Sequence, residues 1–181
     1  MTDGPTPQTH ALAPTQASGI AHTTGAPAAS AEGTLRVCVL ALGGELFAID
    51  LRNISEVFEV EAVTTVPGMP TMLTGVTNLR GTVIPLLDLR SSLGLTEQEG
   101  ALSFAVVVRQ GSRYLGMLVD HVPEIRTVSR DSVLPAMQAG PAGARPFVSS
   151  VLRLDDRLGG VLDVSQIFAQ ADGGGTTPRA S

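Results

Sequence analysis

The chain has 181 residues, a mass of 18.7 kDa and a formal net charge of −5, a size that accommodates one compact domain or two small halves. Hydrophobic residues make up 43% of the chain and aromatic residues only 3%, so a core must be built mainly from Val, Leu, Ile and Ala. An acidic chain with so few aromatic rings lacks the basic and stacking surfaces that nucleic-acid binding requires. All 12 basic residues are Arg, which excludes Schiff-base lysine chemistry and Walker-type phosphate binding.

Composition divides the chain into two tails and a middle. Residues 1–33 are rich in Ala, Thr, Pro and Gly, and residues 172–181 in Gly, Thr and Pro, so both tails are predicted to be disordered. Residues 34–171 form the predicted domain. We expect neither a secretory signal nor a membrane helix, since residues 1–33 contain no Arg and no apolar run approaches the roughly 20 residues of a membrane span. The single cysteine, Cys38, favours a reducing cytoplasm.

Short apolar runs separated by Gly-containing turns predict that the domain is mainly β. In chain order the runs are residues 34–42, 46–51, 83–88, 104–109, 114–119, 147–154 and 158–162. Gly43-Gly44 and Gly111-Ser112 each separate two neighbouring runs, and glycine can adopt the positive φ angles that two-residue hairpins need. We therefore predict two β-hairpins.

One helix is signalled, near the end of the domain. Asp163 followed three residues later by Gln166 forms a capping box. Val164, Ile167 and Phe168 fall on one face of the predicted helix. We expect this short C-terminal helix to close the domain.

An internal repeat relates the two halves of the domain. Three aligned pairs of segments follow the same order, namely residues 37–57 with 105–125 at an offset of 68, then 76–79 with 148–151 and 86–89 with 161–164. The turn glycine Gly43 aligns with Gly111, and Glu56 aligns with Glu124. This preserved order predicts two small, similar β-barrels. Because each half has only about 70 residues, too few for a good independent core, the two should pack together as one folding unit.

Candidate catalytic and metal-binding groups are sparse. His121 is the only histidine of the domain, and one imidazole does not make a metal site, so we interpret it as an exposed loop residue. A nucleophilic pair of Cys38 and His121 is formally possible, but Cys38 lies in an apolar run where burial would raise its pKa. Asp155 and Asp156 are adjacent, which favours a solvated turn over an acid/base pair. The sequence therefore predicts binding without catalysis, and neither a cofactor nor a metal.

The most distinctive stretch is GVTNLRGTVIPLLDLR, residues 75–90. Pro70 and Gly75 are interpreted as bracketing a short turn, and residues 78–81 as a polar bend between two apolar segments. Pro85 cannot donate a ladder hydrogen bond and so marks a strand edge or a bulge. Viewed alone, Arg80 is equally well explained as a surface turn residue.

This stretch resembles the signature of the CheW family of bacterial chemotaxis coupling proteins, in which a GVTNLRG-type segment is followed by an apolar run and Asp-Leu-Arg. ALGGELFAIDLRNISEV is similar to the opening hairpin of the family, and YLGMLVDHVPEI to its equivalent in the second half. The resemblance covers residues 34–171. It implies two packed, pseudo-symmetric, five-stranded SH3-like β-barrels, in agreement with the repeat.

The resemblance also implies a function, that of a non-catalytic cytoplasmic adaptor at membrane-associated receptor arrays. Its partners would be the cytoplasmic tip of a methyl-accepting chemoreceptor and the regulatory domain of the CheA histidine kinase. A homologue that serves a pilus-motility or other non-flagellar array is the alternative, and a small β-barrel enzyme is a distant third. Phe58, His121 and the long N-terminal tail depart from the family pattern and leave the identity of the partners open.

Seven residues are candidates for the coupling site. By similarity, Glu56 and Arg80 match the positions that influence receptor and kinase coupling, and Ile54 and Gly75 match neighbouring functional positions. We expect Glu56 and Arg80 to lie near each other. An apolar groove for a helical hairpin is expected along Ile49, Leu51, Ile54 and Val119, although Ile49 and Val119 could equally belong to the core.

Overall fold

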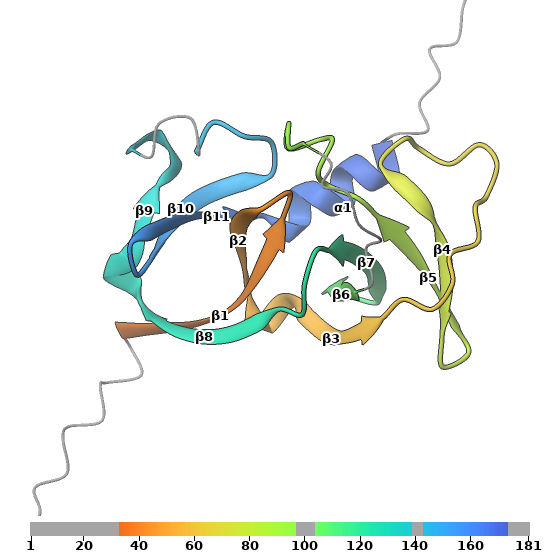
Figure 1. The fold of residues 1–181 in the computed structure, drawn as a ribbon, viewed down its shortest axis with the longest axis horizontal. Helices are drawn as coiled ribbons and strands as arrows, with labels where there is room; N and C mark the ends of the chain where they lie inside the picture. The colour runs from red at the N-terminus through yellow and green to blue at the C-terminus, as the bar shows by residue number, and fades with distance from the viewer. Residues whose placement is uncertain (1–32, 97–103, 139–142, 174–181) are drawn as a thin grey trace, which may run out of the picture.

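The computed structural model describes residues 33–96, 104–138 and 143–173 of the chain (Figure 1). The strands of the first half are β1 (Thr34–Leu42), β2 (Glu45–Asp50), β3 (Ile54–Glu59), β4 (Leu73–Leu79) and β5 (Thr82–Leu87). Those of the second half are β6 (Phe104–Gln110), β7 (Arg113–Val119), β8 (Glu124–Ser129), β9 (Val133–Pro135), β10 (Val148–Leu154) and β11 (Arg157–Leu162), and α1 (Val164–Gly173) follows. Single 3-10 turns occur at η2 (Leu51–Asn53), η3 (Arg130–Ser132) and η4 (Ala136–Gln138).

Each of the seven predicted runs is a strand, with ends that differ by one residue at most. Both predicted hairpins are confirmed, and Gly43 and Gly111 adopt left-handed φ angles of +57° and +61°. The sequence analysis missed β3, β4, β8 and β9. In β3 and β8 half-buried and exposed residues alternate, so charged side chains interrupt the apolar runs that identified the other strands.

The C-terminal helix also forms as predicted. The Asp163 carboxylate accepts hydrogen bonds from the backbone N–H groups of Ser165 at 2.8 Å and Gln166 at 3.3 Å, and so caps the first turn. The predicted apolar face of the helix is buried. The helix runs to Gly173, two residues beyond the expected domain boundary, and Asp172 pairs with Arg113 at 2.5 Å. Residues 1–32 and 174–181, where disorder was expected, lie outside the described residues.

The strands form two sheets that share one plan. One sheet has the order β8-β1-β2-β11-β10-β9 and the other β3-β6-β7-β5-β4. In the repeat, β1, β2, β3, β4 and β5 correspond to β6, β7, β8, β10 and β11. Exchanging each strand for its equivalent converts the order β8-β1-β2-β11-β10 into the order β3-β6-β7-β5-β4. Both sheets also contain one parallel pair at the same place, β2 with β11 and β7 with β5. The additional strand of the first sheet, β9, has no equivalent.

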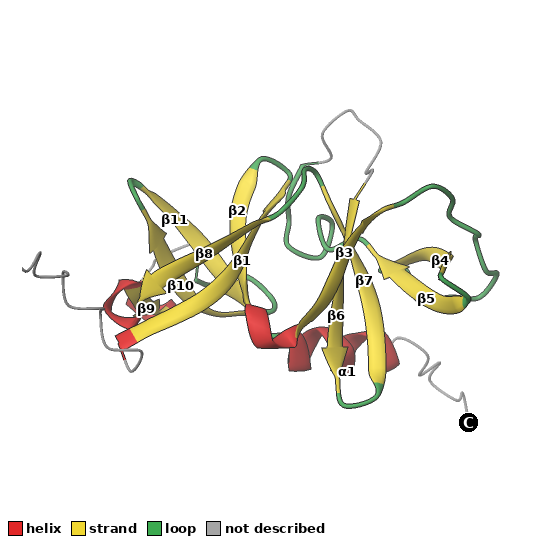
Figure 2. Ribbon diagram, turned by 90° about the horizontal axis from the view of Figure 1, so that it is seen from below, coloured by secondary structure: helices red, strands yellow, loops and turns green. Residues whose placement is uncertain are grey.

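The two halves of the sequence are interleaved between the sheets. β3, β4 and β5 of the first half pair with β6 and β7 of the second, whereas β1 and β2 pair with β8 and β11. Figure 2 shows the sheets beside each other, with α1 running below the sheet that contains β6 and β7. Neither half can complete a sheet alone. This topology is a reason for the two halves to fold as one unit, as expected from their small size.

The strand registers correct one alignment of the repeat. β4 and β10 both carry a bulge, between Leu73 and Gly75 in β4 and between Val148 and Ser150 in β10. These positions are related by an offset of 75 residues, which also relates β5 to β11. Residues 76–79 therefore correspond to 151–154, and the predicted alignment with 148–151 was wrong by three residues. Short apolar segments look alike at several offsets, and only strand pairing distinguishes them.

The main hydrophobic core lies between the two sheets and includes α1. It contains buried side chains from β1, β2, β6, β7, β10 and α1, among them Phe47, Met117 and Phe168. A smaller cluster around Val37 and Leu152 fills the inside of the six-stranded sheet, and another around Leu86 that of the five-stranded sheet. The predicted fold class is thus confirmed as mainly β, with two related sheets and one short C-terminal helix.

Two local interpretations of the motif at residues 75–90 have different outcomes. Gly75 does not bracket a turn, because it lies inside β4, and the turn at Pro70 is closed by a hydrogen bond from the N–H of Leu73 at 2.9 Å. Pro85 immediately precedes Leu86, the residue at which β5 begins to pair with β7. Its missing N–H therefore leaves no gap in that ladder, but β5 lies between β7 and β4, so Pro85 does not mark an edge strand as the sequence suggested. None of the helices in the described part of the chain is long and apolar enough to cross a membrane.

Candidate functional site

Glu56 and Arg80 form an ion pair, with 3.1 Å between Arg80 Nη1 and Glu56 Oε2. Glu56 lies on β3, one edge of the five-stranded sheet, and Arg80 follows β4, the opposite edge. The pair therefore joins the two edges of this sheet. The Arg80 side chain is 80% exposed, so the pair itself contributes only about 0 to 1 kcal/mol to stability. The guanidinium remains accessible to a partner.

The turn that carries Arg80 holds it in a demanding conformation. Arg80 and Gly81 both adopt left-handed φ angles, of +51° and +88°, as in the tight turns of two-residue hairpins. The Asn78 side-chain oxygen accepts a hydrogen bond from the Gly81 N–H at 2.7 Å and stabilises the bend. A left-handed φ costs a non-glycine residue on the order of 1 kcal/mol. The polar bend expected at residues 78–81 is thus confirmed, and it places a strained arginine at its tip.

A shallow cavity of about 320 Å³ adjoins the ion pair. Apolar side chains from three strands contribute to its wall, including Ile84 on β5 and Val107 on β6. Tyr114, the single tyrosine of the chain, also lines it and is 41% exposed. Charged, aromatic and aliphatic groups therefore meet at one corner of the five-stranded sheet, a mixture typical of protein-binding surfaces.

Gly75 and Ile54 contribute to packing near this corner. A Cβ on Gly75 would lie 2.5 Å from the carbonyl oxygen of Thr64, which pairs with Val76. Only glycine fits between these two backbone segments. Ile54 is half-buried and packs against the main core. Gly75 therefore allows β4 to approach the segment around Thr64, and Ile54 anchors β3, the strand that carries Glu56, to the core.

The apolar groove expected from the sequence is wrong for two of its residues. Ile49 and Val119 are fully buried, at 0% exposure, and belong to the main core. Both side chains are enclosed by the main core, although they lie near the ends of β2 and β7, so neither can contact a partner. Leu51 on η2 is half-buried and lines a separate pocket.

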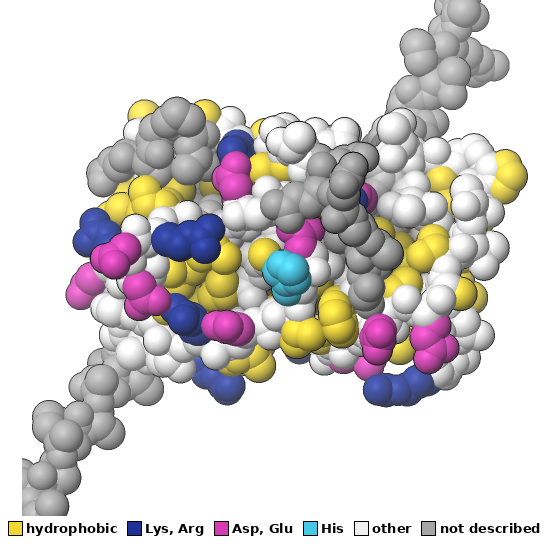
Figure 3. Space-filling model, viewed as in Figure 1, with side chains coloured by type: hydrophobic (Ala, Val, Ile, Leu, Met, Phe, Trp, Pro, Cys, Tyr) yellow, Lys and Arg dark blue, Asp and Glu magenta, His cyan; other side chains and the backbone are white. Residues whose placement is uncertain are grey.

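The exposed apolar residues near β3 and β8 were not identified from the sequence. Val57 on β3 and Ile125 on β8 are 41% and 59% exposed, and they are repeat equivalents at an offset of 68. Val122, the equivalent of Ile54, is also exposed. Figure 3 shows hydrophobic side chains at the surface of this face among charged ones. The repeat that relates these residues was visible in the sequence. The exposure of their side chains could not be predicted from it.

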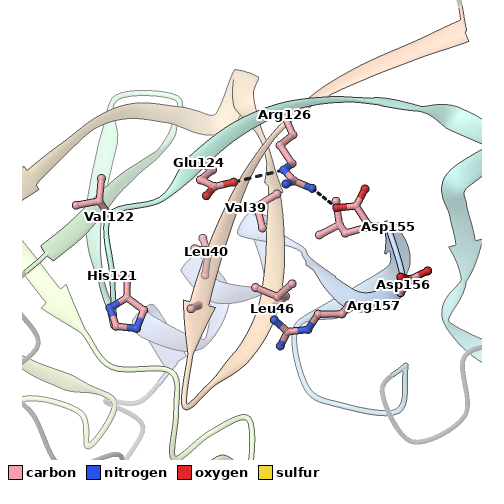
Figure 4. Close-up of a pocket in the computed structure, with 12 residues that line it drawn as sticks. Val39, Leu40, Leu46, His121, Val122, Glu124, Arg126, Asp155, Asp156 and Arg157 are labelled. Atoms are coloured by element: carbon pink, nitrogen blue, oxygen red, sulfur yellow. Dashed lines mark hydrogen bonds and ion pairs between the residues drawn. The ribbon is translucent and has the colours of Figure 1, made fainter.

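The six-stranded sheet has an equivalent corner, shown in Figure 4. Glu124 corresponds to Glu56, and Asp155 corresponds to Arg80. Arg126 lies between the two acids, with its guanidinium 3.4 Å from Glu124 and 2.9 Å from Asp155. A cavity of about 480 Å³ adjoins them. Three charged residues therefore interact at this corner, whereas only Glu56 and Arg80 pair at the corner of the five-stranded sheet.

The candidate catalytic groups do not form a site among the described residues. Burial raises the pKa of the Cys38 thiol to about 11, so the thiol is protonated at neutral pH. His121 is exposed in a loop, as expected, and lines the cavity of Figure 4. Asp155 and Asp156 form the β10–β11 turn. In the part of the chain that the structure describes, no three His, Cys, Asp or Glu residues are grouped so that they could hold a metal ion.

Comparisons with known proteins agree with this geometry. The family model described as the CheW-like domain matches residues 36–172. The chemotaxis protein CheW of Rhizobium meliloti (strain 1021) is 30% identical over 128 residues, which cover 70% of this chain and 83% of that protein. Protein PilI of Pseudomonas aeruginosa is 29% identical over 115 residues, covering 61% of this chain and 62% of that protein.

A solved structure shows the same fold. The crystal structure of the scaffolding protein TtCheW from Thermoanaerobacter tengcongensis matches with a TM-score of 0.64 and 26% sequence identity. The match covers 72% of this chain and 89% of that chain. The resemblance inferred from residues 75–90 is therefore confirmed.

Proposed function

Because the chain belongs to the CheW family, we propose that it is a non-catalytic adaptor that couples the cytoplasmic tip of methyl-accepting chemoreceptors to a CheA-type histidine kinase. It acts in the cytoplasm, at membrane-associated receptor arrays. The relatives named as chemotaxis proteins and the likeness to a scaffolding protein support this proposal.

The Glu56–Arg80 ion pair is the observation that carries the proposed site. It lies at an exposed corner, and its arginine occupies a left-handed backbone position at the tip of the β4–β5 hairpin. Backbone strain of this kind is concentrated at functional positions. Ile54 and Gly75 hold the strands β3 and β4 that carry or precede the pair, and the pair couples receptor binding to the kinase.

The receptor binds along the exposed apolar residues of β3 and β8. Val57, Val122 and Ile125 lie near the acidic residues Glu56 and Glu124 in the sequence of these strands. A helical hairpin with an apolar stripe and flanking basic residues complements such a surface. Leu51 is the one residue of the expected groove that remains both half-exposed and outside the core clusters.

Charge reversal tests the coupling site. Arg80→Glu and Glu56→Arg should each fold normally but fail to support receptor-controlled kinase activity in a reconstituted mixture of receptor, kinase and adaptor. The physical reason is that a like charge against a complementary partner can cost several kcal/mol of association, far more than an exposed pair contributes to folding. The double reversal should recover part of the activity because the two side chains contact each other.

Arg153→Glu is the matched control, because Arg153 is exposed on β10 and forms no ion pair with any described residue. Normal activation by Arg80→Glu would show that Arg80 is only a turn residue. A separate variant that combines Cys38→Ala with His121→Ala should leave kinase activation intact if it remains folded. Loss of activation in that folded variant would contradict a non-catalytic adaptor.

An adaptor of a pilus-motility or other non-flagellar array is the second candidate, and the similarity to Protein PilI favours it. Both candidates bind a receptor and a kinase and differ in the array that contains them. Co-purification from the native cell, followed by identification of the bound receptor and kinase, distinguishes the two.

A further inference from the structure

A basic pocket lies where β1, η2 and η3 meet, away from the Glu56–Arg80 corner. Its volume is about 410 Å³. Three arginines line it, Arg36 from β1, Arg52 from η2 and Arg130 from η3, together with one acid, Asp50. In Figure 2, η2 is the short red turn between the end of β2 and the start of β3, at the crossover from one sheet to the other. The pocket therefore adjoins the segment that connects the two sheets.

The charges of this pocket are only partly neutralised. Asp50 accepts two hydrogen bonds from the Arg52 side chain, at 3.0 Å from Nε and 2.7 Å from Nη2. These bonds are the main reason why the pKa of Asp50 is lowered, and the charge of Arg130 lowers it further. Within the described part of the chain, neither Arg36 nor Arg130 forms an ion pair. Three arginines and one aspartate give the lining a net charge of +2, whereas the whole chain has −5.

The pocket also has an apolar wall. Leu35 and Leu51 line it and are both half-buried, so part of each side chain faces the cavity. Leu35 packs against the small core of the six-stranded sheet, which fixes its position. A ligand that fills this pocket would therefore contact guanidinium groups and aliphatic carbon together. A fully hydrated inorganic anion would use only the first of these features.

The repeat shows that the shared fold does not require this basic character. At an offset of 68, Arg36 corresponds to Phe104 and Arg52 to Asp120. The equivalent position in the other half thus combines an aromatic and an acidic residue. Because the backbone plan is the same in both sheets, the arginines are a specialisation of one surface.

We infer that this pocket binds an acidic peptide segment of a partner protein, through its carboxylates and one apolar side chain. Carboxylates would accept paired hydrogen bonds from Arg36 and Arg130, because guanidinium and carboxylate groups match in geometry. The apolar side chain would pack against Leu35 and Leu51. This surface is separate from Glu56 and Arg80, so the inference does not rest on the proposed function.

Fluorescence anisotropy with a labelled peptide that alternates glutamate and leucine tests the inference on the full chain. We expect binding that weakens as salt increases, because exposed charges are screened. The double variant Arg36→Glu with Arg130→Glu should bind at least about tenfold more weakly, equivalent to about 1.4 kcal/mol. Arg153→Glu, an exposed reversal on β10, should bind as the unmodified chain does. Circular dichroism checks that each variant folds.

Three results would overturn the inference. They are no binding of the acidic peptide, equal binding by the double variant and the unmodified chain, and equal weakening by Arg153→Glu. A peptide that alternates glutamate and serine provides a further test, since the apolar wall predicts weaker binding than with leucine. Displacement of the leucine peptide by inorganic phosphate at similar concentration would instead identify a small-anion site.

Discussion

The β4–β5 hairpin and the β10–β11 hairpin occupy the same place in their two sheets, and their backbones match at the bulge and at the first turn residue, although the second turn residue is left-handed only at Gly81. Each strand pair has a bulge at the same position, and the first turn residue has φ +51° in one hairpin and +52° in the other. The residue at this left-handed position is Arg80 in the five-stranded sheet and Asp155 in the six-stranded sheet. The bulge and the left-handed first turn position are shared, whereas the charge at that position is reversed.

Other equivalent positions show the same reversal. Glu45 at the start of β2 pairs with Arg145, whereas its equivalent at the start of β7, Arg113, pairs with Asp172. Arg113 also lies 4.8 Å from the centre of the Phe168 ring. In both sheets the first residue of the second strand ties down a distant segment, but with opposite charge. Buried apolar residues and glycines maintain the shared frame, and exposed charges can diverge to give each sheet a different surface.

The largest difference in stability that we expect between the two sheets concerns the sequence Asp-Leu-Arg, which begins at the last residue of β2 and occurs again directly after β5. The Arg52 side chain is 84% exposed, whereas that of Arg90 is 9% exposed and pairs with Asp88 at 2.6 Å. Arg90→Ala should lower the free energy of unfolding by about 3 to 5 kcal/mol, because it leaves a partly buried carboxylate without this partner. Arg52→Ala should change the free energy of unfolding much less, because an ion pair with an exposed arginine is screened by solvent. Urea unfolding measures both, and equal losses would contradict the assigned difference in burial.

The bulges of β4 and β10 provide the next comparison. Gly75→Ala would place a methyl group against the Thr64 carbonyl and should destabilise the protein by about 1 to 3 kcal/mol. Ser150, the equivalent residue of β10, already carries a side chain, so Ser150→Ala should change stability little. Thermal unfolding of both variants tests this. If Gly75→Ala leaves the midpoint of thermal unfolding unchanged, the segment around Thr64 moves away easily.

The two corners can be made more alike by substitution. Asp155→Arg alone removes a partner of Arg126 and places two guanidinium groups together, with an expected loss of about 1 kcal/mol or less at this exposed site. Adding Arg126→Phe recreates the combination of Glu56, Phe58 and Arg80 and should recover stability. Chemical denaturation of the single and double variants measures the recovery. If the double variant is less stable than the single one, the corners are not interchangeable.

The smallest effect is the dependence of stability on pH at Glu45. Hydrogen bonding with Arg145 lowers the pKa of Glu45 below 4.5, more than partial burial raises it. The unfolded chain therefore binds more protons in this range, so the stabilisation is present above about pH 4.5 and is lost as pH falls through the lower, folded pKa. Glu45→Gln should remove less than about 1 kcal/mol at neutral pH and flatten this part of the profile. Glu59→Gln, which removes an exposed carboxylate, is the control for urea unfolding at several pH values.

Sequence patterns predicted those parts of the fold that depend on neighbouring residues. The apolar runs, the turn glycines and the Asp163 cap each act over a few positions, and each was confirmed. The proximity of Glu56 and Arg80 was expected from the family resemblance, and the two side chains form an ion pair. The interleaving of the halves was not predicted, because the repeat specifies which segments are alike and not which of them pair. The groove was misplaced at Ile49 and Val119 for a related reason, since an apolar strand residue can face either a core or a partner.

The Asp-Leu-Arg segments separate what the sequence determined from what only the tertiary structure decided. In both, the aspartate accepts a hydrogen bond from the arginine N–H two residues later, at 2.9 Å, and bonds from the guanidinium as well. The identical tripeptide thus determines an identical local geometry. The environment of each arginine depends on packing, since Arg90 is buried within the protein whereas Arg52 lines open pockets at the surface. Burial depends on residues that are distant in sequence, which is why no local pattern could distinguish a structural arginine from one available to a partner.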